Sequence, residues 1–165
     1  MTWFHEVRAF MLGMNDLAEE LGSDSRQAIG DRAAPATNDL ELRVGLVFEE
    51  ACEFVEACGF RVSLAWSPVA ERHSWGLERV RKPDLVAAID ALCDMLYVII
   101  GTFVAWGLNP QPFWDEVHRS NMAKLGPGAT FREDGKMLKP EGWKPPDLRL
   151  VLEDEIAQAK RKETL

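Results

Sequence analysis

The sequence has 165 residues and a formal net charge of −8, from 27 acidic and 19 basic side chains. Apolar residues make up 47% and charged residues 28%, which is typical of a folded soluble domain and excludes a wholly disordered chain. The acidic balance argues against nonspecific binding to a nucleic-acid polymer, because such binding needs a basic surface. Three cysteines are too few for a disulfide scaffold. We expect one domain over residues 1–165, without a secretory leader and located in the cytoplasm.

Helical periodicity predicts an all-α chain, and no stretch alternates convincingly as a strand should. The four core helices are expected over about residues 3–21, 39–58, 83–106 and 112–125. The connections 22–38 and 60–82 are expected to be irregular, and residues 126–165 to form an arm with a short charged helix as a candidate over 148–162.

Local signals predict where the helices begin and end. Asn38 followed by Asp39 offers a cap for the second helix, and Gly59 ends it. Pro83 suits the first turn of the third helix, which Gly107 ends.

The second helix carries a face of glutamates beside an apolar face. Glu49, Glu50, Glu53 and Glu56 fall within one sector at helical spacing. Like charges three and four residues apart repel by a few tenths of a kcal/mol per pair, and no basic residue in this stretch relieves them. A solvated helix surface is the alternative interpretation, and this helix alone does not decide between the two.

The third helix is apolar on all sides except for two aspartates. Asp90 and Asp94 lie on one stripe with Tyr97 and Gly101. The helix is long enough to span a membrane, but two carboxylates near its middle would cost several kcal/mol there, which favours a soluble bundle. Two carboxylates in an apolar setting need cations, supplied either by a metal or by Arg and Lys from elsewhere.

If the second and third helices pack antiparallel, their carboxylates converge in one groove. The expected cluster is Glu49, Glu50, Glu53, Asp90 and Asp94. Carboxylate oxygens suit Mg²⁺ or Mn²⁺, which keep water ligands available for a substrate phosphate. A carboxylate that does not bind the metal is a candidate general base.

The segment from Arg119 to Lys144 is basic. It holds six basic and three acidic residues, a net charge of +3, which leaves −11 on the rest of the chain. Cations beside an acidic metal site suit a polyphosphate substrate. The alternative is a solvated tail that pairs with the acidic body or with a neighbouring subunit.

Four stretches resemble the all-α nucleotide pyrophosphohydrolases, the MazG-like and phosphoribosyl-ATP pyrophosphohydrolase-like group. They are FEEACEFVEA (48–57), DALCDMLYVIIGT (90–102), GLNPQPFWDEVHRSNMAKLG (107–126) and REDGKMLKPEGWKPPDL (132–148). The resemblance implies a four-helix bundle core with an extended C-terminal arm, assembled as a homodimer or homotetramer. It also implies metal-dependent hydrolysis of a nucleoside triphosphate to the monophosphate and pyrophosphate.

The resemblance also implies roles for individual residues. Glu50, Glu53 and Asp94 would be metal ligands, and Glu49 a ligand or the base that activates water. The family writes its second motif ExxD, but Ala91 stands three residues before Asp94, so Asp90 is taken as the substitute ligand. The expected substrate contacts are Tyr97, Asn121, Lys124, Lys136 and Lys139.

The leading hypothesis is therefore a Mg²⁺- or Mn²⁺-dependent (deoxy)nucleoside triphosphate pyrophosphohydrolase that controls the nucleotide pool. Its base is open: dUTP, dCTP and a phage-type dGTP activity are all candidates. Phosphoribosyl-ATP hydrolysis is the alternative within enzymes. A non-catalytic helical adaptor, whose acidic groove binds a basic partner, is the alternative from a different class.

Overall fold

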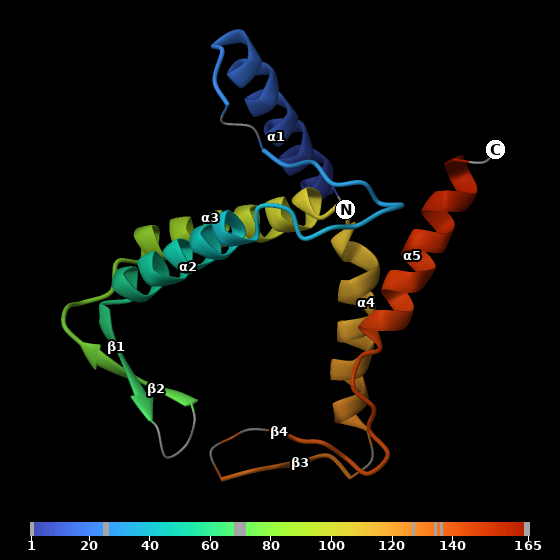
Figure 1. Cartoon of the computed structure of the whole chain (residues 1–165). Helices are drawn as coiled ribbons and strands as arrows, with labels where there is room; N and C mark the ends of the chain where they lie inside the picture. The colour runs from blue at the N-terminus through green and yellow to red at the C-terminus, as the bar shows by residue number, and fades with distance from the viewer. Residues whose placement is uncertain are drawn as a thin grey trace. The chain divides into compact units, whose positions relative to one another are not determined.

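The computed structural model describes residues 2–24, 27–67, 72–126, 128–133, 135 and 137–163. The chain divides into two compact units. The first combines residues 1–38 with 103–165, and the second is the continuous stretch 39–102. Figure 1 shows the elements of both units. The described elements are mainly helical, which confirms the predicted all-α class. The single domain and the packing of helices from both units into one bundle stay predictions.

The second unit consists of two helices joined by a β-hairpin (Figure 1). Helix α2 spans Leu40–Ala57 and helix α3 spans Leu85–Ala105, of which the part up to Thr102 lies in this unit. The strands are β1, Phe60–Ser67, and β2, Arg72–Arg79.

The β-hairpin corrects the expectation that residues 60–82 are irregular. β1 and β2 pair antiparallel over their full length, with Phe60 opposite Arg79 and Val62 opposite Leu77. The sequence does alternate here, because apolar residues stand at every second position from Phe60 to Trp66. The prediction was wrong because this period-two signal was not recognised as a strand.

The ends of α2 and α3 are tied together, which makes the two helices antiparallel. The backbone N–H of Asp84 donates to the carbonyl oxygen of Ala57 at 2.8 Å, and that of Val80 donates to Gly59 at 2.9 Å. Gly59 follows the end of α2 with a positive φ of 83°, which confirms the predicted stop. Residues before Ala57 therefore face residues after Asp84, as the expected carboxylate cluster requires.

Two of the predicted helix starts need correction. Pro83 precedes α3 and lies outside its first turn; the side chain of Asp84 instead accepts from the backbone N–H groups of Val86 and Ala87 at 3.0 and 3.1 Å. Asp39 occupies the position before α2 but makes no side-chain cap, because its backbone is left-handed with a φ of 51°. The residue that caps α3 is therefore Asp84, which the sequence analysis did not name.

Helix α3 leaves much of its apolar surface exposed in the single chain. The exposed fractions are 72% for Leu85, 79% for Val86 and 52% for Ile89. By length and composition α3 is also the one described helix that could cross a membrane, a property that core helices of soluble proteins share. The burial expected of an all-apolar helix is therefore incomplete within one chain.

The first unit contains three longer helices (Figure 1). They are α1, Thr2–Glu20, α4, Pro110–Met122, and α5, Leu148–Glu163, and the 3₁₀ turn η1, Ala123–Leu125, extends α4. Two short strands, β3 at Thr130–Phe131 and β4 at Met137–Leu138, pair antiparallel in the arm. Helix α5 confirms the candidate helix at the C-terminal end of the arm.

Two glycines let the 22–38 connection cross the turn between α3 and α4. The backbone N–H of Gly30 donates to the carbonyl oxygen of Val104 at 3.0 Å. A side chain at Gly30 would overlap the backbone of Gly107, and one at Gly107 would overlap Asp31. Gly107 also has a positive φ of 75°, which L side chains rarely adopt. Only glycine fits both positions of this crossing.

Candidate active site

The carboxylates predicted from helical spacing do gather in the second unit, around Glu50. Burial raises the pKa of Glu50, and the negative charges of Glu53, Asp94, Glu49 and Asp90 raise it further, in that order. Two of these neighbours come from α2 and two from α3. The structure therefore confirms that the glutamates of one helix and the aspartates of the other lie within electrostatic reach.

Glu50 occupies the centre of this acidic cluster. Its Oε2 atom is buried and has no hydrogen-bond partner, whereas the side chains of Glu49, Glu53, Asp90 and Asp94 are exposed. A buried carboxylate oxygen without a partner is costly, because it has lost its water and gained nothing in exchange. The unpartnered oxygen thus lies where the negative charge of the cluster is most concentrated.

The five side chains do not meet at one point. Among the residues that the structure describes, no three His, Cys, Asp or Glu side chains lie close enough together to hold one metal ion. The donor set, which consists of carboxylate oxygens from facing helices, nevertheless has the chemistry that Mg²⁺ and Mn²⁺ prefer.

Tyr97 lies on α3 one turn after Asp94, and its side chain is 40% exposed. The i,i+3 spacing places its phenol on the same helix face as that carboxylate. It is accessible to a ligand bound beside the acidic cluster. Its role as a substrate contact stays a prediction.

Three of the four remaining predicted substrate contacts gather in the first unit around one indole ring. The Lys139 ammonium lies 4.2 Å from the centroid of the Trp143 ring, and that of Lys124 lies 5.5 Å away. Lys124 also donates to the Oδ1 atom of Asn121 at 2.8 Å. Cation–π attraction thus holds two ammonium groups near one another, although like charges repel. The fourth, Lys136, lies outside the described residues.

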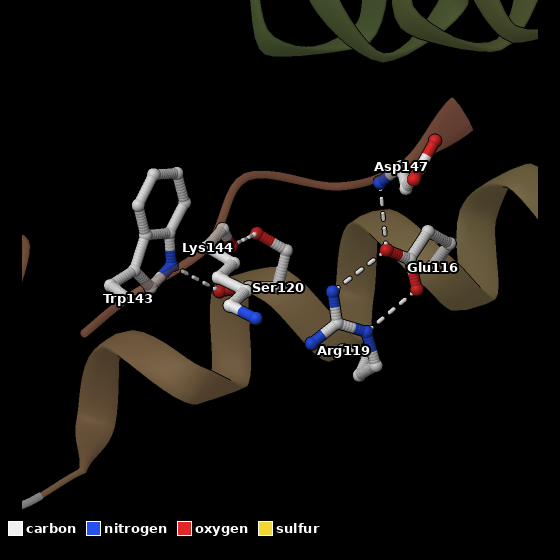
Figure 2. A network of polar contacts seen from close by, with 6 residues as sticks. All are labelled: Glu116, Arg119, Ser120, Trp143, Lys144 and Asp147. Carbon is white, nitrogen blue, oxygen red and sulfur yellow. Dashed lines mark hydrogen bonds and ion pairs between the residues drawn. The ribbon is translucent and has the colours of Figure 1, made fainter. Parts of the chain in front are cut away.

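Trp143 is itself fixed to α4 by hydrogen bonds that the sequence did not predict (Figure 2). Its Nε1 donates to the carbonyl oxygen of Ser120 at 2.8 Å, and the hydroxyl of Ser120 donates to the carbonyl oxygen of Lys144 at 3.2 Å. Ser120 is only 1% exposed. The arm is therefore tied to the end of α4, and the ring that holds the two lysines has a defined position.

A second tie between α4 and the arm is ionic (Figure 2). Arg119 donates to both carboxylate oxygens of Glu116, at 2.6 and 2.7 Å, and the backbone N–H of Asp147 donates to the same carboxylate at 2.9 Å. These bonds, that from Arg119 first, lower the pKa of Glu116 to about 2. Glu116 in turn raises the pKa of Arg119. This carboxylate is satisfied, in contrast to Glu50.

Sequence reasoning missed Trp143, Ser120 and Glu116 as organisers of the arm. The bonds that join α4 to the arm connect positions 23 to 31 residues apart, so no periodic pattern indicates them. The pair of Glu116 with Arg119 is the exception, because these residues lie three positions apart on α4. The two stretches that contain the three organisers were used for the family resemblance and for the expected substrate contacts Asn121, Lys124, Lys136 and Lys139. The signal that could have indicated the contact between Ser120 and Trp143 is their presence in two stretches that both resemble the same family.

The helical fold and the acidic cluster on facing helices are those of an all-α nucleotide pyrophosphohydrolase. A family model described as phosphoribosyl-ATP pyrophosphohydrolase matches residues 16–121, which is more than half of the chain. The protein therefore belongs to the phosphoribosyl-ATP pyrophosphohydrolase family. A search among curated proteins returned no match.

Family membership establishes the broad character of the protein. It is a soluble hydrolase of the nucleotide pyrophosphohydrolase class. Enzymes of this family generally depend on a divalent metal. The matched range includes α2, α3 and α4 as far as residue 121, so the acidic cluster lies inside it, as do Glu116 and Ser120. Their partners in the arm lie beyond it.

Proposed function

We propose that this protein hydrolyses a (deoxy)nucleoside triphosphate to the monophosphate and pyrophosphate, with Mg²⁺ or Mn²⁺ as its cofactor. The observation that carries the proposal is the acidic cluster around Glu50, whose buried Oε2 atom lacks a partner. A protein keeps such an arrangement at a cost to its stability, which is characteristic of functional sites.

Glu50, Glu53, Asp90 and Asp94 are the residues that would hold the metal. All four offer carboxylate oxygens, and Glu50 already has an oxygen free of hydrogen bonds. A bound divalent ion neutralises phosphate charge and stabilises the charge that develops as the anhydride breaks. A bound cation is expected to lower the pKa of Glu50, because it offsets the charges of the neighbouring carboxylates, which add to the effect of burial.

Glu49 is the proposed general base. In the reaction a water oxygen forms a bond to the α-phosphorus, and the bond between that phosphorus and the oxygen bridging to the β-phosphate breaks. Glu49 accepts the proton of the water, and pyrophosphate leaves with the bridging oxygen. Glu49 suits this role because its side chain is exposed beside the cluster and so can reach a bound water.

Cations of the basic segment from Arg119 to Lys144 are proposed to bind the phosphates. Lys124 and Lys139 supply two ammonium groups at one ring, and Asn121 adds an amide. Lys136 belongs to the same proposal by its place in the DGKMLKP stretch. Tyr97 is proposed to contact the substrate from α3.

Assembly as a homodimer or homotetramer in the cytoplasm is part of the proposal, and neither a membrane nor a nucleic-acid polymer is an expected partner. The exposed apolar side chains of α3 support association, because large apolar surfaces are costly to leave in water. Light scattering coupled to size-exclusion chromatography tests this, and a monomer across the micromolar range would contradict it.

Phosphoribosyl-ATP is the second candidate substrate, since the matching family model carries that description. It shares with a nucleoside triphosphate the anhydride that water cleaves to release pyrophosphate. A dUTP, dCTP or dGTP preference is the first candidate.

The test is a panel of all nucleoside and deoxynucleoside triphosphates together with phosphoribosyl-ATP, with Mg²⁺ or Mn²⁺, scored for pyrophosphate release. We expect one or a few triphosphates to be cleaved, and Glu53→Gln and Asp94→Asn to abolish the cleavage. Glu41→Gln, on the same helix but in its first turn, is the matched control. Turnover of phosphoribosyl-ATP alone would favour the second candidate. No turnover of any member would overturn the proposal and favour the helical adaptor.

A further inference from the structure

A pocket of about 590 Å³ lies in the second unit, between the C-terminal half of α2 and the β1–β2 hairpin. This volume falls within the range of pockets that bind small molecules, roughly 300–1,000 Å³. Its α2 wall consists of Cys52, Val55 and Glu56. The hairpin wall comes from residues 60–62 and 80–81, in a region that the sequence analysis expected to be irregular.

The pocket is mainly apolar, with two guanidinium groups. Val55, Phe60, Val62 and Val80 supply its apolar walls. Such a combination of apolar walls with a few polar groups is typical of sites that bind a small organic ring. It is unlike a phosphate site, in which backbone N–H groups and cations dominate the lining.

The cations of the pocket are Arg61 and Arg81. The Nη2 atom of Arg81 donates to the carbonyl oxygen of Glu56 at 2.7 Å, which fixes this guanidinium against the α2 wall. Arg61 lies 3.8 Å from Glu78 in a loose, exposed ion pair, so it can turn toward a ligand. Guanidinium groups stack on planar rings and donate to carbonyl oxygens and ring nitrogens.

The pocket and the acidic cluster are neighbours on the same helix. Glu56, in the pocket wall, follows Glu53 by three residues and Glu50 by six. At a rise of 1.5 Å per residue, these separations along the helix are about 4.5 and 9 Å. A nucleotide whose phosphates lie at the cluster would carry its ring, across the sugar, to a distance of this order.

We propose that this pocket binds the nucleobase of the substrate, with apolar walls on its faces and the arginines at acceptor atoms on its edge. The inference rests on the proposed function, because it assumes that the phosphates bind at the acidic cluster. It assigns base recognition to the β1–β2 hairpin.

Filling the pocket tests the assignment. Val62, which is 41% exposed, can be replaced by Trp without burying a larger side chain in a core. For Val62→Trp we expect the KM for the preferred triphosphate to rise about tenfold, with kcat within about twofold of wild type. Leu148→Trp, at an equally exposed position in the first unit, is the matched control and should leave both constants unchanged.

Inorganic tripolyphosphate distinguishes the base from the phosphates, since it has no ring. As a competitive inhibitor it should bind wild type and Val62→Trp equally. A second variant, Arg61→Gln, should raise KM by about three- to tenfold through loss of a charged donor, whereas Lys82→Gln, a neighbouring cation that does not line the pocket, should not.

The outcomes separate the two proposals. If wild type cleaves a triphosphate but both pocket variants keep its KM, the pocket assignment is wrong and the proposed function stands. An equal loss of tripolyphosphate binding in Val62→Trp would also overturn the assignment, because it would indicate a phosphate site or a misfolded hairpin. If wild type cleaves nothing, the proposed function fails and the pocket assignment fails with it.

Discussion

Glu50 and Glu116 are two half-buried glutamates on helices whose environments are opposite. Glu116 accepts three hydrogen bonds, two of them from one guanidinium, and its pKa falls to about 2. Glu50 has a buried oxygen without a partner and four carboxylates around it, and its pKa rises. The difference separates a carboxylate whose oxygens the fold pairs with donors from one whose buried oxygen the fold leaves without a partner. Glu116 forms an ion pair with Arg119, whereas the charged groups that act on Glu50 are carboxylates.

The largest expected effect is on Glu50. Glu50→Gln removes a charge from the acidic cluster, so pyrophosphate release should fall about 100-fold or more. The same change should raise the Tm in the presence of EDTA, because the repulsion from Glu53 and Asp94 is relieved. Thermal melts and activity assays check both effects. A lower Tm together with full activity would show that Glu50 is a structural residue like Glu116.

The pH dependence of that Tm gain follows from the raised pKa. Wild-type Glu50 is protonated in the fold at pH values where it would ionise in the unfolded chain, so its cost to stability is absent below its ordinary value of 4.5 and grows as the pH rises through the folded pKa. Glu50→Gln should therefore melt higher than wild type at pH 7 and no higher at pH 4. A gain that is independent of pH would have another cause.

An intermediate effect is expected at Trp143. Its ring is hydrogen-bonded to Ser120 on α4 and lies beside the proposed phosphate contacts Lys124 and Lys139. Trp143→Leu removes the ring that Lys124 and Lys139 share, and we expect the KM for the triphosphate to rise about three- to tenfold with little change in kcat. Trp143→Phe keeps a ring face and should recover most of the affinity. Trp114→Leu, at a 63% exposed position on α4, is the control. Equal KM values for all three variants would contradict the role of the ring.

The smallest effect is expected at Glu116, and its sign is opposite to that at Glu50. Because the pKa of Glu116 is lowered to about 2, its stabilisation is complete above the ordinary value of 4.5 and is lost as the pH falls from 4.5 toward 2. Glu116→Gln should therefore lower the Tm at pH 7, and the difference from wild type should shrink across that interval. Glu153→Gln, an exposed glutamate on α5, serves as the control. An unchanged difference at pH 3 would rule out the ionic tie to Arg119 as its cause.

Local patterns predicted the parts of the site that lie within single helices. The spacing of Glu49, Glu50 and Glu53 and of Asp90 and Asp94 follows directly from helical geometry. The cluster across α2 and α3 was predictable as well. It required only one further assumption, that the two helices pack antiparallel.

Features that depend on distant partners were not predictable in this way. The β-hairpin was missed although Phe60 and Val62 begin an alternating run, since strand preference depends strongly on the partner strand. The tie from Glu116 to Asp147 joins positions 31 residues apart, and nothing at either position indicates the other. Pro83 was assigned to a first turn for which Asp84 is the actual cap.

The first unit is built from two stretches of chain with the whole second unit between them. Arg32 forms an ion pair with Glu155, 123 residues further along the chain, and Gly30 donates to Val104. During synthesis the connection that contains Gly30 and Arg32 must therefore wait for most of the protein to leave the ribosome before these partners exist. Residues 39–102, in contrast, are contiguous and can pair their hairpin and helices as soon as they emerge. A nascent chain that stalls before Val104 would thus already contain the acidic cluster, while residues 103–165 of the first unit had not yet been made.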